Sequence, residues 1–147
     1  MDSLNFNEGY KELAINGDES RVIRIDLTDY GMLERLNESY KKIDEFQKNC
    51  EDININADGT PADKLNASAE MLTKFRTLIE EQIDYILDSK VSKIVFGNKN
   101  PLSTVNGVPL YQGFLNALAP YIKEVMQREQ KESKKKIEKY TKVLKKW

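Results

Sequence analysis

Apolar residues recur every three or four positions along two long stretches of the chain, and this spacing predicts an amphipathic helix for each stretch. The first stretch follows Thr28 and Asp29, two residue types that commonly cap helices, and the second follows Thr60 and starts at Pro61. We expect the second helix to run from about Pro61 to Asp88 and to form the centre of the core, because its apolar stripe is the wider one. The stripe residues are Tyr30, Leu33, Leu36, Tyr40, Ile43 and Phe46 in the first helix, and Leu65, Ala69, Leu72, Phe75, Ile79, Ile83 and Ile86 in the second.

Two shorter segments before these helices alternate between apolar and polar residues. The segments are 11–16 and 21–27, and Asn16-Gly17-Asp18 between them supplies residues that tolerate positive φ. Alternation places Leu13 and Ile15 on one face of the first segment, and Ile23, Ile25 and Leu27 on one face of the second. We predict a β-hairpin whose apolar face is covered by a helix or by a strand of another chain, since two strands alone are marginal in water.

The segment after residue 90 is punctuated by glycine and proline. Residues 91–96 read as a short apolar helix turn or strand, and residues 98–108 have the composition of a loop. A helical pattern resumes at Pro109. Pro120 lies inside that pattern, where it removes one backbone hydrogen bond, so we expect a bend between Ala117 and Pro120.

The last twenty residues differ from the rest of the chain in charge. Residues 128–147 hold nine Lys/Arg against three Glu, a net of +6, and because the whole chain sums to -1, residues 1–127 carry -7. No apolar side chain occurs from Gln127 to Lys136. The stripe that follows consists of Ile137, Tyr140, Leu144 and Trp147. We therefore predict a basic amphipathic helix that lies away from the body and binds a partner through its apolar stripe.

Together these patterns predict a mainly α fold in which an N-terminal β-hairpin packs on a small helical bundle and a basic amphipathic C-terminal helix protrudes. The predicted division is a helical domain with the hairpin over residues 1–127 and a helical tail over residues 128–147. At 147 residues the chain is long enough for one ordinary core.

The composition offers little for catalysis. The chain contains no histidine, which excludes His-based triads and HExxH zinc sites, and Cys50 is its one cysteine, which excludes Cys-rich zinc sites and an internal disulfide. No glycine-rich phosphate-binding motif occurs. We expect no catalytic residue, no metal and no cofactor, and so no enzyme.

One segment partly matches a calcium-binding loop. Asn54, Asn56, Asp58 and Gly59 occupy positions 1, 3, 5 and 6 of an EF-hand pattern. Position 12 is Leu65, which lacks the carboxylate that closes such a site. We interpret the segment as a polar turn that leads into a capped helix.

Location and partners can be bounded in the same way. No apolar run reaches the roughly 18 residues that span a bilayer, and the first residues lack the features of a secretion signal, so a soluble, cytoplasmic protein is expected. The basic tail fits a protein partner or self-association best. The alternatives are a solubilising role, nucleic acid and, least of all, a membrane surface.

The order of these elements resembles that of the small tail assembly chaperones of siphophages and prophages of Gram-positive bacteria. The matching motifs are Leu13-Ala14-Ile15-Asn16-Gly17, Ile23-Arg24-Ile25-Asp26-Leu27-Thr28-Asp29, Ile94-Val95-Phe96-Gly97 with Asn100-Pro101, and Phe114-Leu115-Asn116-Ala117-Leu118-Ala119-Pro120-Tyr121-Ile122. The resemblance spans about residues 6 to 122. It implies a non-enzymatic role in the bacterial host cell, in which the protein binds the tape measure protein and keeps it soluble during tail assembly.

Two other functions stay open beside this one. They are a nucleic-acid-binding phage accessory protein that uses the basic tail, and a structural subunit of the virion. For the chaperone we expect a homo-oligomer that contacts its helical client or a neighbouring copy through Phe114, Leu118, Ile137, Tyr140, Leu144 and Trp147.

Overall fold

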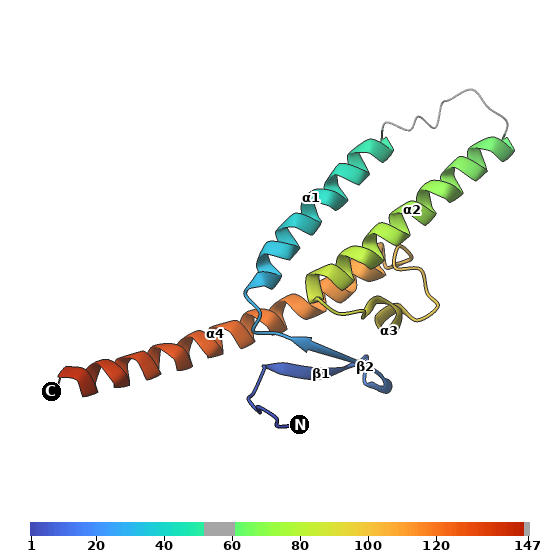
Figure 1. The fold of residues 1–147 in the computed structure, drawn as a ribbon. Helices are drawn as coiled ribbons and strands as arrows, with labels where there is room; N and C mark the ends of the chain where they lie inside the picture. Colours follow the sequence, from blue (N-terminus) through green and yellow to red (C-terminus); the bar gives the residue numbers. More distant parts are fainter. Residues whose placement is uncertain (52–60, 146–147) are drawn as a thin grey trace.

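The computed structural model describes the backbone of residues 1–51 and 61–145, and the side chains of residues 1–49 and 68–139 (Figure 1). The elements in chain order are β1 (Tyr10–Ile15), β2 (Asp18–Asp26), α1 (Gly31–Glu51), α2 (Pro61–Leu87), α3 (Ser92–Phe96), β3 (Thr104–Val105), β4 (Val108–Pro109) and α4 (Leu110–Lys145). The predicted mainly α fold with an N-terminal hairpin and a long C-terminal helix is confirmed.

The N-terminal hairpin forms as predicted. β1 and β2 are antiparallel, and the turn between them is Asn16-Gly17, whose φ angles of 53° and 75° suit the tight hairpin turns that asparagine and glycine favour. Ile23, Ile25 and Leu27 are buried, while Leu13 and Ile15 are only partly covered. One face of the hairpin therefore joins the core, as its alternation predicts.

The core lies where β2, α2, α3 and α4 meet. α2 contributes more fully buried apolar side chains than any other element, which agrees with its predicted central place. The buried residues of the helices include Ile79, Ile83, Ile86 and Leu87 from α2, Val95 and Phe96 from α3, and Leu118 and Val125 from α4. Beyond the core, α1 and α2 run side by side in opposite directions (Figure 1), and the rings of Phe46 and Phe75 stack at 5.2 Å.

The structure covers only half of the stripe predicted for α1, namely Leu36, Ile43 and Phe46. Tyr30, Leu33 and Tyr40 were expected in the stripe, but they are 59%, 53% and 52% exposed. The covered positions are Met32, Leu36, Ser39, Ile43 and Phe46. Their spacing of 4, 3, 4 and 3 is the regular helix-pairing pattern, and it includes a serine whose hydroxyl donates a buried hydrogen bond of 2.8 Å to Gln82 Oε1 on α2. A hydrophobicity pattern alone passes over that serine.

The connection between α2 and α4 is more ordered than expected. The segment 91–96 is helical in α3 and ends at Gly97, and the expected loop contains a short second hairpin formed by β3 and β4. Its turn residues Asn106 and Gly107 have φ angles of 53° and 81°, so the same Asn-Gly chemistry serves twice in the chain. The loop prediction overlooked this signal.

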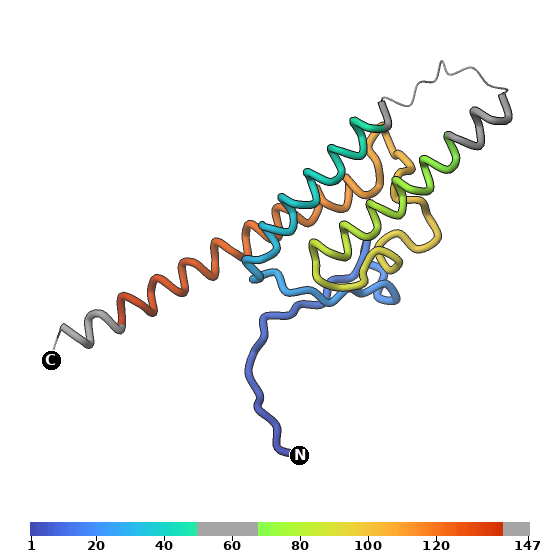
Figure 2. Tube along the Cα trace, turned by 45° about the horizontal axis from the view of Figure 1, so that its top comes forward, coloured from blue at the N-terminus to red at the C-terminus, as the bar shows by residue number. Residues whose placement is uncertain are grey.

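α4 is one uninterrupted helix with Pro120 inside it, at the place where a bend was expected. Pro120 and Asn116 are both exposed, which allows water to satisfy the carbonyl that proline leaves unbonded. The helix also crosses the predicted domain boundary at residue 128 without a break. From Gln127 to Lys139 every side chain is exposed, and this part projects from the body (Figure 2).

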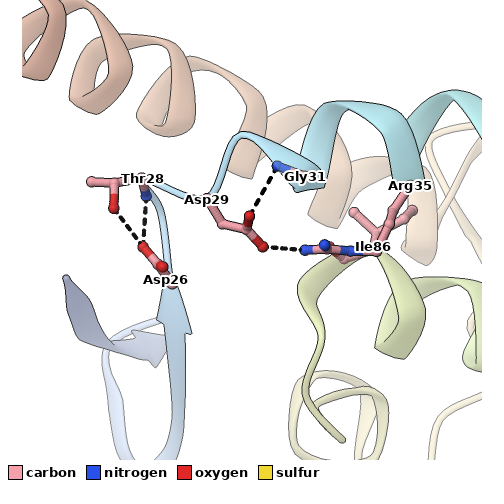
Figure 3. A network of polar contacts seen from close by, with 6 residues as sticks. All are labelled: Asp26, Thr28, Asp29, Gly31, Arg35 and Ile86. Carbon is pink, nitrogen blue, oxygen red and sulfur yellow. Dashed lines mark hydrogen bonds and ion pairs between the residues drawn. The ribbon is translucent and has the colours of Figure 1, made fainter. Parts of the chain in front are cut away.

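A polar joint connects β2, α1 and α2 (Figure 3). Asp29 Oδ1 accepts a hydrogen bond of 2.9 Å from the Gly31 amide at the start of α1, and Asp29 Oδ2 accepts one of 2.6 Å from Arg35. Arg35 Nε also donates to the Ile86 carbonyl on α2 at 3.1 Å. The hydrogen bond from Arg35 lowers the pKa of Asp29 below its ordinary value of 3.8. The joint therefore caps α1 and holds it against the end of α2.

Replacing Asp29 with asparagine tests this joint. Asp29→Asn should lower the free energy of unfolding by about 1–2 kcal/mol at pH 7, because a partly buried charged hydrogen bond is lost. Since the pKa of Asp29 is lowered in the folded state, its stabilisation is present above pH 3.8 and is lost as pH falls below that value. Urea unfolding of the wild type and of Asp29→Asn at several pH values should show that the difference between their free energies of unfolding shrinks as pH falls below 3.8. The control Asp44→Asn, in the exposed pair with Lys48, should change stability by less than about 0.5 kcal/mol.

Candidate partner-binding site

An open apolar groove lies between the N-terminal hairpin, α3, the short second hairpin and the first turns of α4. Its volume is about 790 Å³. We call it the hairpin groove. Its lining includes Leu13, Ile15, Ile23, Val95, Phe96, Val108, Gly113, Phe114 and Leu118, together with Arg21 and Lys99. Among the described lining residues these two cations are the charged ones.

Local sequence features explain how the groove is shaped. Alternation in the hairpin directs Leu13 and Ile15 toward it, and the Phe114 ring meets Phe96 edge to face at 6.2 Å. Arg21 Nε donates to the Ile94 carbonyl at 3.1 Å, and its Nη2 donates to the Val95 carbonyl. The guanidinium thus satisfies carbonyls at the end of α3 and ties that helix to the hairpin.

A second concave surface lies where α4 passes the start of α1. We call it the α1–α4 corner, and it measures about 760 Å³. Its lining consists of Tyr30, Glu124, Gln127, Arg128, Gln130, Lys131, Ser133, Lys134 and Ile137. Ile137 is 62% exposed, so the corner combines two exposed apolar side chains with a cationic rim.

An apolar stripe on α1 extends away from this corner. Leu33 and Tyr40 are seven residues apart and share one face of the helix, and Tyr30 lies one turn before Leu33. Burial raises the pKa of Tyr111 at the start of α4, and the nearby charge of an ionised Tyr40 on α1 raises it further. Tyr30, Leu33 and Tyr40 are the half of the predicted stripe of this helix that the structure leaves exposed.

The residues predicted to contact a partner fall in two different places. Phe114 and Leu118 line the hairpin groove, with Leu118 only 6% exposed at its base. Ile137 lies in the α1–α4 corner, roughly 35 Å along the helix from Phe114. Tyr140 and Leu144 continue α4, but their side chains lie outside the described residues, as does all of Trp147. Their contact with a partner stays a prediction.

Sequence analysis also missed two contributors to these surfaces. Tyr30 lines the same concave surface as Arg128, Lys131 and Lys134. Gly113 opens the wall of the hairpin groove, since a Cβ there would meet no atom within 4 Å. The Asn-Gly turns were a usable signal for the hairpins, whereas no local signal connects Tyr30 with residues a hundred positions away.

The resolved pKa shifts keep their groups in the usual charge state near neutral pH. Hydrogen bonds from Ser20 lower the pKa of Asp18, as Arg35 does for Asp29. The hydrogen bond to Glu38 raises the pKa of Tyr85. Among the side chains of residues 1–49 and 68–139, no three His, Cys, Asp or Glu are grouped so that they could hold a metal ion. The partial EF-hand segment at 54–59 lies outside the described residues. These surfaces offer apolar and charged contacts to a binding partner.

No described helix is both long enough and apolar enough to cross a membrane. Comparison with family models, curated proteins and solved structures finds no match to this chain.

The groove wall can be tested through Arg21. Arg21→Ala should lower the free energy of unfolding by about 1–2 kcal/mol, because the carbonyls of Ile94 and Val95 lose a charged donor. The control is Arg24→Ala, which removes a cation from above the Tyr10 ring, 4.2 Å from its centroid, and should cost under about 1 kcal/mol. Urea unfolding measures both changes. Equal losses would show that Arg21 does not secure α3.

Proposed function

We propose that this protein is a non-enzymatic assembly chaperone of the siphophage tail type, which binds the long helical tape measure protein and keeps it soluble. The observation that carries the proposal is the exposed apolar stripe of Tyr30, Leu33 and Tyr40, which meets the projecting helix α4 at a concave corner. The order of elements along the chain, which resembles that family, supports it from the sequence side.

A helical client fits this surface better than a small molecule. An amphipathic helix docks through apolar side chains on one face, and Leu33 and Tyr40, seven residues apart on α1, offer two apolar contacts along the length of such a helix, with Tyr30 one turn before Leu33. The corner beside it is open, so a rod-shaped client can pass through. Arg128 along the rim is paired with Glu124 at 3.1 Å, and Lys131 and Lys134 beside this pair favour a client whose polar flank carries Asp or Glu.

The expected affinity is modest. Each half-exposed apolar side chain contributes about 1 kcal/mol when a client covers it, and association itself costs several kcal/mol. Several copies bound along one elongated client would strengthen the whole through avidity. Such reversible binding suits a chaperone that has to leave before the tail tube closes around its client.

The test is co-expression with a tape measure protein, the long helical client that the proposal names. Leu33→Ser combined with Tyr40→Ser should reduce the soluble, co-purifying client roughly tenfold, because two anchors are lost. The matched control is Leu72→Ser on α2. Leu72 was expected in the apolar stripe of α2 but is 55% exposed, and it lies outside the exposed stripe on α1. Unchanged client recovery with the double variant would contradict the proposal, provided that both variants unfold at the wild-type urea concentration.

Nucleic-acid binding is the second candidate, and the placement of Tyr30 favours it. An exposed ring beside Arg128, Lys131 and Lys134 provides both stacking and phosphate contacts. Under this alternative, binding to a fluorescent single-stranded oligonucleotide should weaken steeply between about 50 and 200 mM salt. Changing the three cations to glutamine should weaken it further, while Lys90→Gln with Lys93→Gln should not. Apolar capture of a helical client should change little over the same salt range.

A further inference from the structure

One edge of the N-terminal hairpin is open. β1 pairs with β2 on one side, and no described strand pairs with its other side. The pairing is regular from Tyr10 to Ala14, and the register shift comes only after Ala14. This leaves a straight row of backbone donors and acceptors beside the half-buried Leu13 and the hairpin groove.

The first eight residues form an extended arm with a matching pattern. Leu4 and Phe6 are 93% and 76% exposed, and the arm leads away from the body (Figure 2). In a strand these two side chains would share one face, and Ser3, Asn5 and Asn7 would share the other. Asp2 and Glu8 lie at the two ends of the face that carries Leu4 and Phe6, so this face has a short apolar centre that suits a strand lying over an apolar groove.

We infer that the N-terminal arm of one copy adds as a strand to the open edge of β1 in a second copy, with Leu4 and Phe6 in its hairpin groove. Backbone pairing along β1 provides affinity, and the two apolar side chains provide specificity. Charge agrees with this placement, because the arm carries Asp2 and Glu8 whereas the charged lining residues of the groove are Arg21 and Lys99.

The exit geometry of the arm is why the occupant is a second copy. Gly9 has φ of +86°, and a Cβ on it would lie 2.8 Å from Thr28 Oγ1 and 3.1 Å from Asp26 Oδ1. Because Gly9 has no side chain, the chain can turn close to Thr28 and Asp26 here, and from this turn the arm leads away from the body (Figure 2). An arm that leaves its own body can reach the open edge of β1 in a second copy, either reciprocally in a pair or from copy to copy along an assembly. This interface lies apart from the α1–α4 corner and does not depend on the proposed client.

Three variants of the full chain test the interface. Leu4→Ser with Phe6→Ser removes the apolar face of the arm and should weaken self-association roughly 100-fold in sedimentation equilibrium. Gly113→Leu fills the groove from a position where the Cβ has space, and it should weaken self-association comparably. The controls are Asn5→Ser on the polar face of the arm and Gly113→Ala, both of which should associate like wild type. Gly113→Leu also improves helix propensity, so its thermal unfolding should occur no lower than that of wild type.

Mixing the two weakened proteins separates this interface from a loss of folding. The Gly113→Leu protein keeps an intact arm and the arm variant keeps an intact groove, so the mixture should associate although neither protein does so alone. A fluorescein-labelled peptide of residues 1–9 should likewise bind the arm variant and fail to bind that variant when it also carries Gly113→Leu. Wild-type protein that stays monomeric, arm and groove variants that self-associate as wild type does, or a peptide that shows no saturable binding would each overturn the inference.

Discussion

Ile23 and Ile25 project from one face of β2, and Leu27 follows directly after the strand; all three are almost fully excluded from water. Their burial contributes on the order of 6 kcal/mol to folding, which the two-stranded sheet needs because a hairpin alone is marginal. The cover over this face comes from helices far along the chain, chiefly the end of α2, α3 and the middle of α4. Covering the apolar face of β2 thus brings the distant helices together and fixes where the two concave surfaces form.

Polar contacts set the orientation of the helices that this apolar burial brings together. Arg35 joins Asp29 to the Ile86 carbonyl, and Ser39 joins Gln82, so the rotation of α1 against α2 is set by two hydrogen-bonded side chains. The same rotation turns Leu33 and Tyr40 outward. A binding stripe therefore arises from the packing that stabilises α1, since the apolar residues of that helix exceed what one neighbour can cover.

The long helix α4 serves both surfaces. Its first turns supply Phe114 and Leu118 to the hairpin groove and core, and its exposed stem supplies the cations of the α1–α4 corner. Because one uninterrupted helix carries both parts, their separation is fixed by helical rise. A protein that positions neighbours and a client along a rod requires such a fixed spacing, which is consistent with the proposed role in assembly.

Periodicity, caps and Asn-Gly turns were enough to predict the hairpin, the two long helices, the short segment before Gly97 and the projecting basic helix. These features depend on residues within a few positions of one another, so local sequence was sufficient to predict them. The buried face of α1, the continuity of α4 through Pro120 and the shared surface of Tyr30, Lys131 and Lys134 depend on how distant segments pack. They could not be predicted, because a wide apolar stripe fits several rotations of a helix and only packing against particular neighbours selects one.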